Sequence, residues 1–133
     1  MHRQALISGS LLAALAVILG AFGAHALKAV VTPEKLVIFE TGVRYHFYHS
    51  LALLATGIIY SHFPAKQLRL ATAFFIIGIA LFSGSLYGMV FLSINGGSIG
   101  PLGILTPIGG LFFITAWILL ALGIAGAKKS SIP

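Results

Sequence analysis

The chain contains no cysteine and only two acidic residues among its 133 residues. The absence of cysteine excludes disulfides, thiolate metal sites, iron–sulfur clusters and haem attachment through a C-x-x-C-H motif. Charged residues of both signs make up only 8% of the chain, whereas a soluble globular domain carries roughly 25%. This composition is therefore not that of an ordinary soluble domain.

One long stretch of the chain has no side chain that is charged near neutral pH. Residues 70–127 contain no Asp, Glu, Lys, Arg or His, and a helix needs only about 20 apolar residues to cross a bilayer. Hydrophobic residues make up 59% of the whole chain, and its mean hydropathy is +1.07. We therefore predict an integral membrane protein in which residues 70–127 cross twice.

The apolar runs predict an all-α fold, with four transmembrane helices in one compact bundle over residues 1–133. Backbone groups in lipid must form hydrogen bonds within their own segment, and the alternation of a membrane barrel is absent. The first run also resembles a signal peptide, but it is longer than the roughly 7–15 residues of a signal core. The last helix is expected to begin with Thr106 as N-cap and Pro107 at the first helical position. The expected helices are 5–27, 42–62, 70–94 and 105–127.

Basic residues near the helix ends predict the orientation of the chain. The side with both termini has five of them and the opposite side has three, so the positive-inside rule places both termini in the cytoplasm. The basic residues are scattered, which favours lipid headgroups over nucleic acid as their partner. The five are Arg3, Lys66, Arg69, Lys128 and Lys129, and the three are Lys28, Lys35 and Arg44.

Polar residues gather at the expected start of the second helix. Glu40 and Arg44 are one turn apart and are expected to form an ion pair at the membrane interface. The polar positions of all four helices fall in one leaflet, so we predict a pocket in the outer leaflet that stops near the midplane. Its expected binding residues are His25, Tyr45, His49, Ser85, Tyr87 and Thr106.

Two histidines offer a different chemistry. His46 and His49 are three residues apart on one side of a helix and are weak candidates for a metal site. No cysteine or aspartate is available as a further ligand, so no metal and no cofactor is predicted. Trp117 is expected near the bilayer centre, where its indole N–H needs a partner such as a hydroxyl on a neighbouring helix.

Small residues are spaced for close helix packing. The third helix has Gly84 and Gly88 in a G-x-x-x-G pattern, which lets helix backbones approach in lipid. The pattern favours a tight bundle or a homo-oligomer. A stripe on the first helix consists of Gly9, Ala13, Ala16, Gly20 and Ala24.

Four short motifs together resemble domain-of-unknown-function family 423. This family comprises small membrane proteins of bacteria, with an animal mitochondrial relative, transmembrane protein 256. The resemblance implies a four-helix protein of the inner membrane and brings no catalytic residues with it. The motifs are GAFGAHAL (20–27), ETGVRYHFYHSLALL (40–54), LFSGSLY (81–87) and TPIGG (106–110).

Three functions fit these features and are ranked in the following order. The first is a non-enzymatic membrane protein that binds a partner, a lipid or a small amphiphile through the polar pocket. The second is a small oligomeric transporter or channel with a path between protomers. The third is an enzyme or cofactor carrier that uses His25, His46 and His49.

Overall fold

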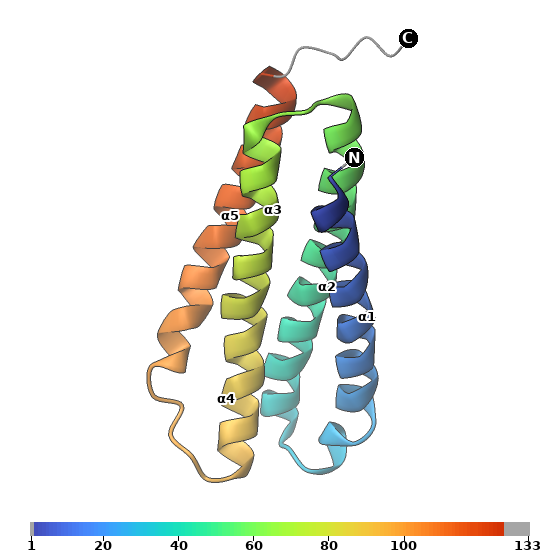
Figure 1. Cartoon of the computed structure of the whole chain (residues 1–133). Coiled ribbons are helices and arrows are strands. Elements are labelled where there is room, and N and C mark those ends of the chain that lie inside the picture. Colours follow the sequence, from blue (N-terminus) through green and yellow to red (C-terminus); the bar gives the residue numbers. More distant parts are fainter. Residues whose placement is uncertain (1, 127–133) are drawn as a thin grey trace.

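The computed structural model describes residues 2–126, which form helices that run side by side along the chain's long axis (Figure 1). The first crossing is α1 (Arg3–Ala24), followed by a 3-10 turn, η1 (Leu27–Ala29), and the second is α2 (Pro33–His62). The third crossing is α3 (Lys66–Gly78), a π-helical segment η2 (Ile79–Ser83) and α4 (Gly84–Ile94). The fourth is α5 (Leu102–Gly126).

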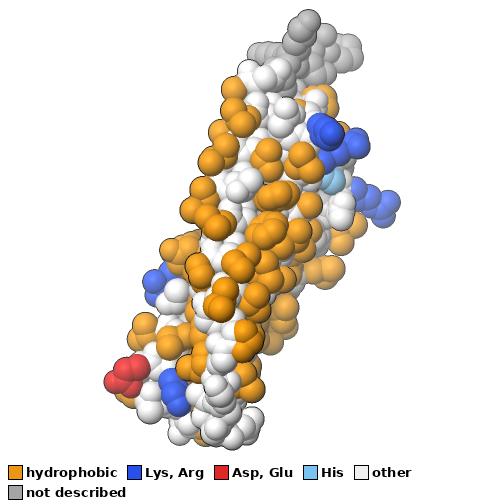
Figure 2. All heavy atoms as spheres, turned by 90° about the vertical axis from the view of Figure 1, so that its left-hand side faces the viewer, with side chains coloured by type: hydrophobic (Ala, Val, Ile, Leu, Met, Phe, Trp, Pro, Cys, Tyr) orange, Lys and Arg blue, Asp and Glu red, His pale blue; other side chains and the backbone are white. Residues whose placement is uncertain are grey.

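Three of these crossings are apolar enough to span a bilayer by their own composition: Arg3–Ala29, Lys66–Ile94 and Leu102–Gly126. Helix α2 is more polar, but its 30 residues extend about 45 Å and lie between α1 and the third crossing. Figure 2 shows the face on the left of Figure 1, where hydrophobic side chains cover the middle. The chain is an all-α integral membrane protein with four transmembrane helices, as the sequence predicts.

All four transmembrane helices begin earlier than the apolar runs predicted, and α1 spans Arg3–Ala24 rather than 5–27. Helix α2 begins at Pro33 rather than residue 42, α3 at Lys66 rather than 70, and α5 at Leu102 rather than 105. A helix can continue beyond the hydrocarbon, where charged side chains reach water, so a charge-free run underestimates its length. Glu34 lies in the first turn of α2, and a hydrogen bond from the backbone N–H of Glu34 to its own carboxylate lowers the pKa of this side chain.

The predicted start of the last helix is wrong. Pro107 lies inside α5, and Thr106 is therefore a helical residue rather than an N-cap. Backbone hydrogen bonds from Leu102 to Ile99 and from Ile104 to Pro101 start the helix one turn earlier. Proline has no N–H, so its position costs α5 one hydrogen bond close to the helix start. The predicted last residue of this helix, 127, and the basic pair Lys128 and Lys129 lie outside the described residues.

Small residues hold α1 against α2. A Cβ atom on Gly9 would lie 3.0 Å from the Ser50 carbonyl oxygen, and one on Gly20 would lie 3.3 Å from Val43. The predicted packing role of this stripe is confirmed at these two positions. Gly84 differs, because a Cβ atom there would meet nothing within 4 Å; it does not bring two helices of this chain together.

Helix α5 lies against the third crossing, on α3, η2 and α4. At Gly109 the two backbones approach closely, since a Cβ atom there would clash with the backbone nitrogen of Phe82. The main apolar core lies between these elements and α2 and includes Leu53, Phe75 and Phe113. This contact lets the Phe113 and Trp117 side chains of α5 reach His49 in the middle of α2.

Candidate binding site in the middle of the bundle

His46 and His49 lie on either side of the middle of α2, and only 2% and 6% of their surfaces are exposed. The sequence predicted shallow positions because it placed the start of the helix at residue 42. With the start at Pro33, His49 is about 24 Å along the helix. The two imidazoles therefore lie near the middle of α2. Their depth in the bilayer, and with it the outer-leaflet position of the pocket, stays a prediction.

His49 belongs to a closed contact set, which we call the His49 network: His49, the Tyr45 carbonyl, Phe113 and Trp117. Nδ1 of His49 lies 2.6 Å from the Tyr45 carbonyl oxygen, and the Trp117 indole N–H donates to Nε2 at 3.2 Å. A carbonyl only accepts and an indole only donates, so His49 is neutral with its hydrogen on Nδ1. Its ring also stacks on Phe113, with centroids 3.4 Å apart. Every polar ring atom of His49 is satisfied within the protein.

His46 is paired on one side only. Its Nδ1 lies 3.0 Å from the Tyr87 hydroxyl oxygen of α4. Its Nε2 is buried and has no hydrogen-bond partner, and no other buried side-chain nitrogen or oxygen in residues 2–126 shares this condition. The sequence assigned Tyr87 to a pocket with His49, whereas the structure pairs it with the neighbouring histidine.

His46 and Tyr87 line an apolar groove of about 270 Å³, which we call the His46 groove. Helix α1 forms one wall and the third crossing forms the other, with Gly84 leaving space between them. Leu15 in the wall is 43% exposed, so the groove opens toward the lipid. Its lining residues are Leu12, Leu15, Leu19, His46, Ile76, Ile79, Ala80, Gly84 and Tyr87.

The six predicted binding residues do not form one cluster. His25 is exposed at the end of α1, two residues beyond Gly23, where a Cβ atom would meet the Phe39 ring. Phe39 is ten residues before His49, or about 15 Å along α2. His25 therefore lies at the end of the bundle, far from the imidazole it was expected to meet.

The remaining predicted residues lie in separate contacts. Ser85 and Thr106 join α4 to α5 through hydroxyl oxygens that are 2.6 Å apart. The Tyr45 ring is 39% exposed and packs on Phe82, with centroids 4.7 Å apart. Its backbone carbonyl, not its hydroxyl, contacts His49.

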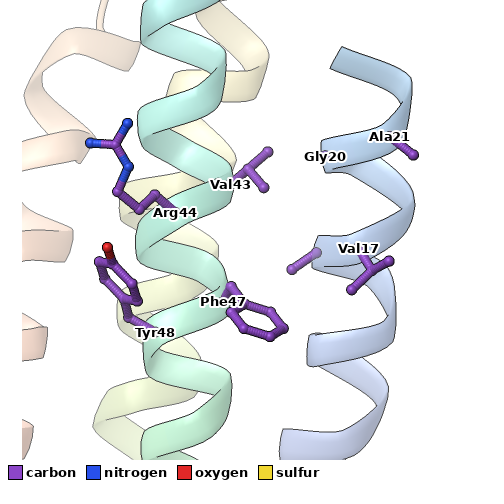
Figure 3. A pocket seen from close by; sticks show the side chains of 8 residues that line it. Val17, Gly20, Ala21, Val43, Arg44, Phe47 and Tyr48 are labelled. Carbon is purple, nitrogen blue, oxygen red and sulfur yellow. The ribbon is translucent and has the colours of Figure 1, made fainter. Parts of the chain in front are cut away.

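Glu40 and Arg44 are both exposed on α2. Within residues 2–126 no ion pair joins their side chains, and such a pair remains a prediction. Arg44 and Tyr48 border a second apolar groove of about 340 Å³ between α1 and α2. Figure 3 shows Arg44 and Tyr48 pointing away from α1, while Val43 and Phe47 point toward it. This groove contains no buried unpaired polar atom, so the His46 groove is the stronger candidate site.

Metal binding has no geometric support in the described part of the chain, where no three His, Cys, Asp or Glu side chains are grouped to hold an ion. His46 Nδ1 and both His49 nitrogens already have protein partners.

Sequence reasoning missed the partner of Trp117 and the separate roles of the two histidines. It foresaw that the indole N–H needs a partner on a neighbouring helix, but the partner is an imidazole rather than a hydroxyl. It also missed η2, where the Ser83 hydroxyl donates to the Gly42 carbonyl at 2.7 Å. A π-helical segment depends on tertiary contacts and has no periodic signal of its own.

These features define the chain as a membrane-embedded helical protein with a polar centre between its helices. Comparison of the sequence with known families then identifies it: residues 19–110 match the family described as "Protein of unknown function (DUF423)", and the chain belongs to that family. The resemblance found in the sequence motifs is thereby confirmed.

The relatives of the chain are named as membrane proteins. It is 41% identical over 116 residues to the UPF0382 membrane protein YwdK of Bacillus subtilis, covering 86% of this chain and 90% of the relative. It is 28% identical over 130 residues to the UPF0382 inner membrane protein YgdD of Escherichia coli, covering 98% and 95%. No solved structure matches the chain.

Proposed function

We propose that this protein is a non-enzymatic binding protein for a small amphiphile, which it holds in the His46 groove. One observation supports the proposal above all: the Nε2 atom of His46 is buried without a partner beside an apolar groove that opens to lipid. A buried polar atom without a hydrogen bond costs roughly 1–3 kcal/mol. Nε2 is closed to water in the ligand-free chain, so a ligand with an apolar chain and one polar atom would remove this cost once the leucine side chains of the groove wall shift to expose it.

The walls of the groove favour an apolar chain. Leu12, Leu15 and Leu19 follow each other along α1 at spacings of three and four and face the third crossing. Dispersion contacts and shape, rather than the hydrophobic effect, would hold a chain there, because lipid tails are equally apolar. The polar atom of the ligand would then provide orientation and selectivity.

Filling the groove tests the proposal. Gly84→Phe places a ring in the groove without a clash at Cβ, because nothing lies within 4 Å of that position. Gly103→Phe is the matched control, since Gly103 also has an unobstructed Cβ position but lies on α5, away from the groove. Native mass spectrometry in lipid nanodiscs with methyl undecyl ketone as probe should show binding to the wild type and to Gly103→Phe only. Equal binding by Gly84→Phe would overturn the proposal.

We also propose the inner membrane as the location, with both termini in the cytoplasm. Support comes from the distribution of basic residues and from the name of the Escherichia coli relative. A cysteine introduced at Ser98, in the loop before α5, should react with an impermeant thiol reagent from outside intact cells. A cysteine introduced at Ser61 should react only after the membrane is opened, and the reverse pattern would contradict this orientation.

Homo-oligomerisation is a further part of the proposal. Arg44, Tyr48 and Trp117 are exposed in the membrane-spanning region, and a charge facing hydrocarbon is costly unless it is covered or reaches the interface. A second copy of the chain would cover them. Cysteine cross-linking at Tyr48 should give a dimer, with Ile18 on the outer face of α1 as the control site. A protein that remains monomeric in nanodiscs would rule this out.

A further inference from the structure

The hydrogen bond between His46 and Tyr87 limits which polar group the groove can accept. A neutral imidazole carries one hydrogen, on either Nδ1 or Nε2, and a phenol can donate or accept. Two arrangements are therefore possible. In the first, the Tyr87 hydroxyl donates to Nδ1 and the hydrogen of His46 is on Nε2. In the second, Nδ1–H donates to the Tyr87 oxygen and Nε2 carries a bare lone pair.

The two arrangements differ in how many polar groups remain unpaired. The Tyr87 hydroxyl has no hydrogen-bond partner other than His46 within the described residues. The first arrangement leaves one unpaired group, the Nε2–H of His46. The second leaves two, the Nε2 lone pair and the O–H of Tyr87. The backbone carbonyl of Leu12 on α1 also faces the imidazole, without the geometry of a hydrogen bond to Nε2, and an acceptor on that side favours a hydrogen on Nε2. The first arrangement is therefore favoured.

We infer that Nε2 of His46 is a hydrogen-bond donor and that the groove selects an amphiphile whose polar group is a neutral acceptor, the carbonyl oxygen of a ketone, quinone or ester. This inference rests on the proposed function and specifies its ligand class. An alcohol can also accept a bond from Nε2–H, but its own hydroxyl hydrogen would then lack an acceptor among the apolar side chains of the groove.

The lining of the groove also favours a neutral group. It contains no charged side chain, and the walls are leucine, isoleucine, alanine and glycine apart from His46 and Tyr87. A carboxylate or ammonium group in this apolar groove would be desolvated with no opposite charge to pair with. The histidine three residues further along α2 shows the opposite arrangement, with its hydrogen on Nδ1 because a carbonyl faces that atom.

The hydrogen position can be read directly. In protein labelled with ¹⁵N at histidine, the spectrum of the ligand-free chain in nanodiscs should show His46 protonated on Nε2 and His49 on Nδ1. The resonances are assigned with His46→Gln and His49→Gln. A His46 spectrum with the hydrogen on Nδ1 would overturn the inference and leave the proposed function standing.

The ligand class is tested with three probes of equal chain length: methyl undecyl ketone, the secondary alcohol made by reducing it, and tridecane. The ketone should bind roughly three- to tenfold more tightly than the alcohol or the alkane, the ratio expected for one net hydrogen bond. In Tyr87→Phe, Nδ1 loses its donor and the hydrogen can move, so the preference for the ketone should fall. Binding of the alcohol as tight as that of the ketone would overturn the inference, whereas binding of none of the probes would overturn the proposed function.

Discussion

The His49 network and the His46 groove lie about one helical turn apart on α2. Each contains a buried histidine, but the two histidines differ in how many of their ring nitrogens are paired. On the His49 side, α5 supplies an indole donor and a stacked ring, and both imidazole nitrogens are paired. On the His46 side, α1 and the third crossing supply apolar walls, and one nitrogen is left buried and unpaired.

The difference shows which element decides the role of a buried histidine. Both imidazoles come from one helix at nearly one depth, so neither propensity nor burial separates them. Helix α5 approaches closely because Gly109 has no side chain, and its Phe113 and Trp117 reach His49. Gly84 has no such neighbour and leaves space beside the other histidine. We interpret the His49 network as a structural lock and the His46 groove as the proposed binding site.

The largest loss of stability is expected from Gly109→Ala, which disturbs the contact between α5 and η2 that positions the His49 network. The new methyl group would lie within 3 Å of the Phe82 backbone, which cannot move like a flexible side chain. Overpacking typically costs about 1–3 kcal/mol, and we expect the upper end of that range. Reversible unfolding in mixed micelles measures the loss. Gly110→Ala is the control, since its Cβ would be 3.9 Å from Phe82; equal losses in both variants would contradict the close approach.

His49→Leu should cost about 2 kcal/mol, because Trp117 loses its acceptor in a region without water and Phe113 loses its stacked partner. The unfolding free energy in mixed micelles is again the measurement, and His62→Leu at the exposed end of α2 should change it by less than about 0.5 kcal/mol. A double-mutant cycle with Trp117→Phe should show coupling between the two positions. Additive losses would mean that the indole and the imidazole do not interact.

Ser83→Ala should have a smaller effect, about 0.6 kcal/mol, the average for a hydrogen bond between membrane helices. The Ser83 hydroxyl of η2 donates to the Gly42 carbonyl of α2 and so joins the third crossing to the helix that carries both histidines. Ser93→Ala is the matched control, because the Ser93 hydroxyl bonds only to Val90 in its own helix. Thermal stability of the two variants in the same detergent should rank Ser83→Ala lower. The opposite rank would show that this interhelical bond does not stabilise the fold.

The smallest effect on stability is expected from substitutions in the His46 groove. The double variant His46→Leu with Tyr87→Phe removes both polar partners and should stay within about 1 kcal/mol of the wild type or exceed it, because replacing both members of a buried pair can be neutral or stabilising. It should nevertheless lose the preference for the ketone probe. A large loss of stability would show that the pair is a second structural lock, and the comparison between the two sides would then fail.

The extent of the fold was predictable from composition, and the ends of its helices were not. Four apolar runs set the number of crossings, because a bilayer requires each to be about 20 residues long. The start of α2 was missed because Glu34, Lys35 and Glu40 interrupt the apolar run while remaining compatible with a helix beyond the hydrocarbon. The start of α5 was missed because Pro107 was taken as the start signal, whereas the turn after Ile99 begins the helix.

The candidate site was predictable in content and only partly in arrangement. Spacing along α2 identified His46, His49 and Tyr45 as polar groups that need partners. It could not show that Tyr87 would reach His46 and Trp117 would reach His49, because these contacts depend on the rotation of α4 and α5 about their axes. The π-helical turn between α3 and α4 sets part of that rotation. His25 was assigned to the same pocket only because it was expected in the same leaflet. Its distance from His49 along the bundle axis keeps the two residues apart.

The sequence by itself determined that this chain lies in a membrane, that it crosses it as four helices and that its scarce polar groups gather on α2, because these properties follow from hydrophobicity summed along the chain. Only the tertiary structure decided which histidine is satisfied and which is left open. Hydrogen bonds and close contacts act over a few ångströms between helices that are distant in sequence. A glycine at 109 lets α5 close against η2, while a glycine at 84 with no neighbour leaves a groove, and the same residue type therefore has opposite consequences in the two places.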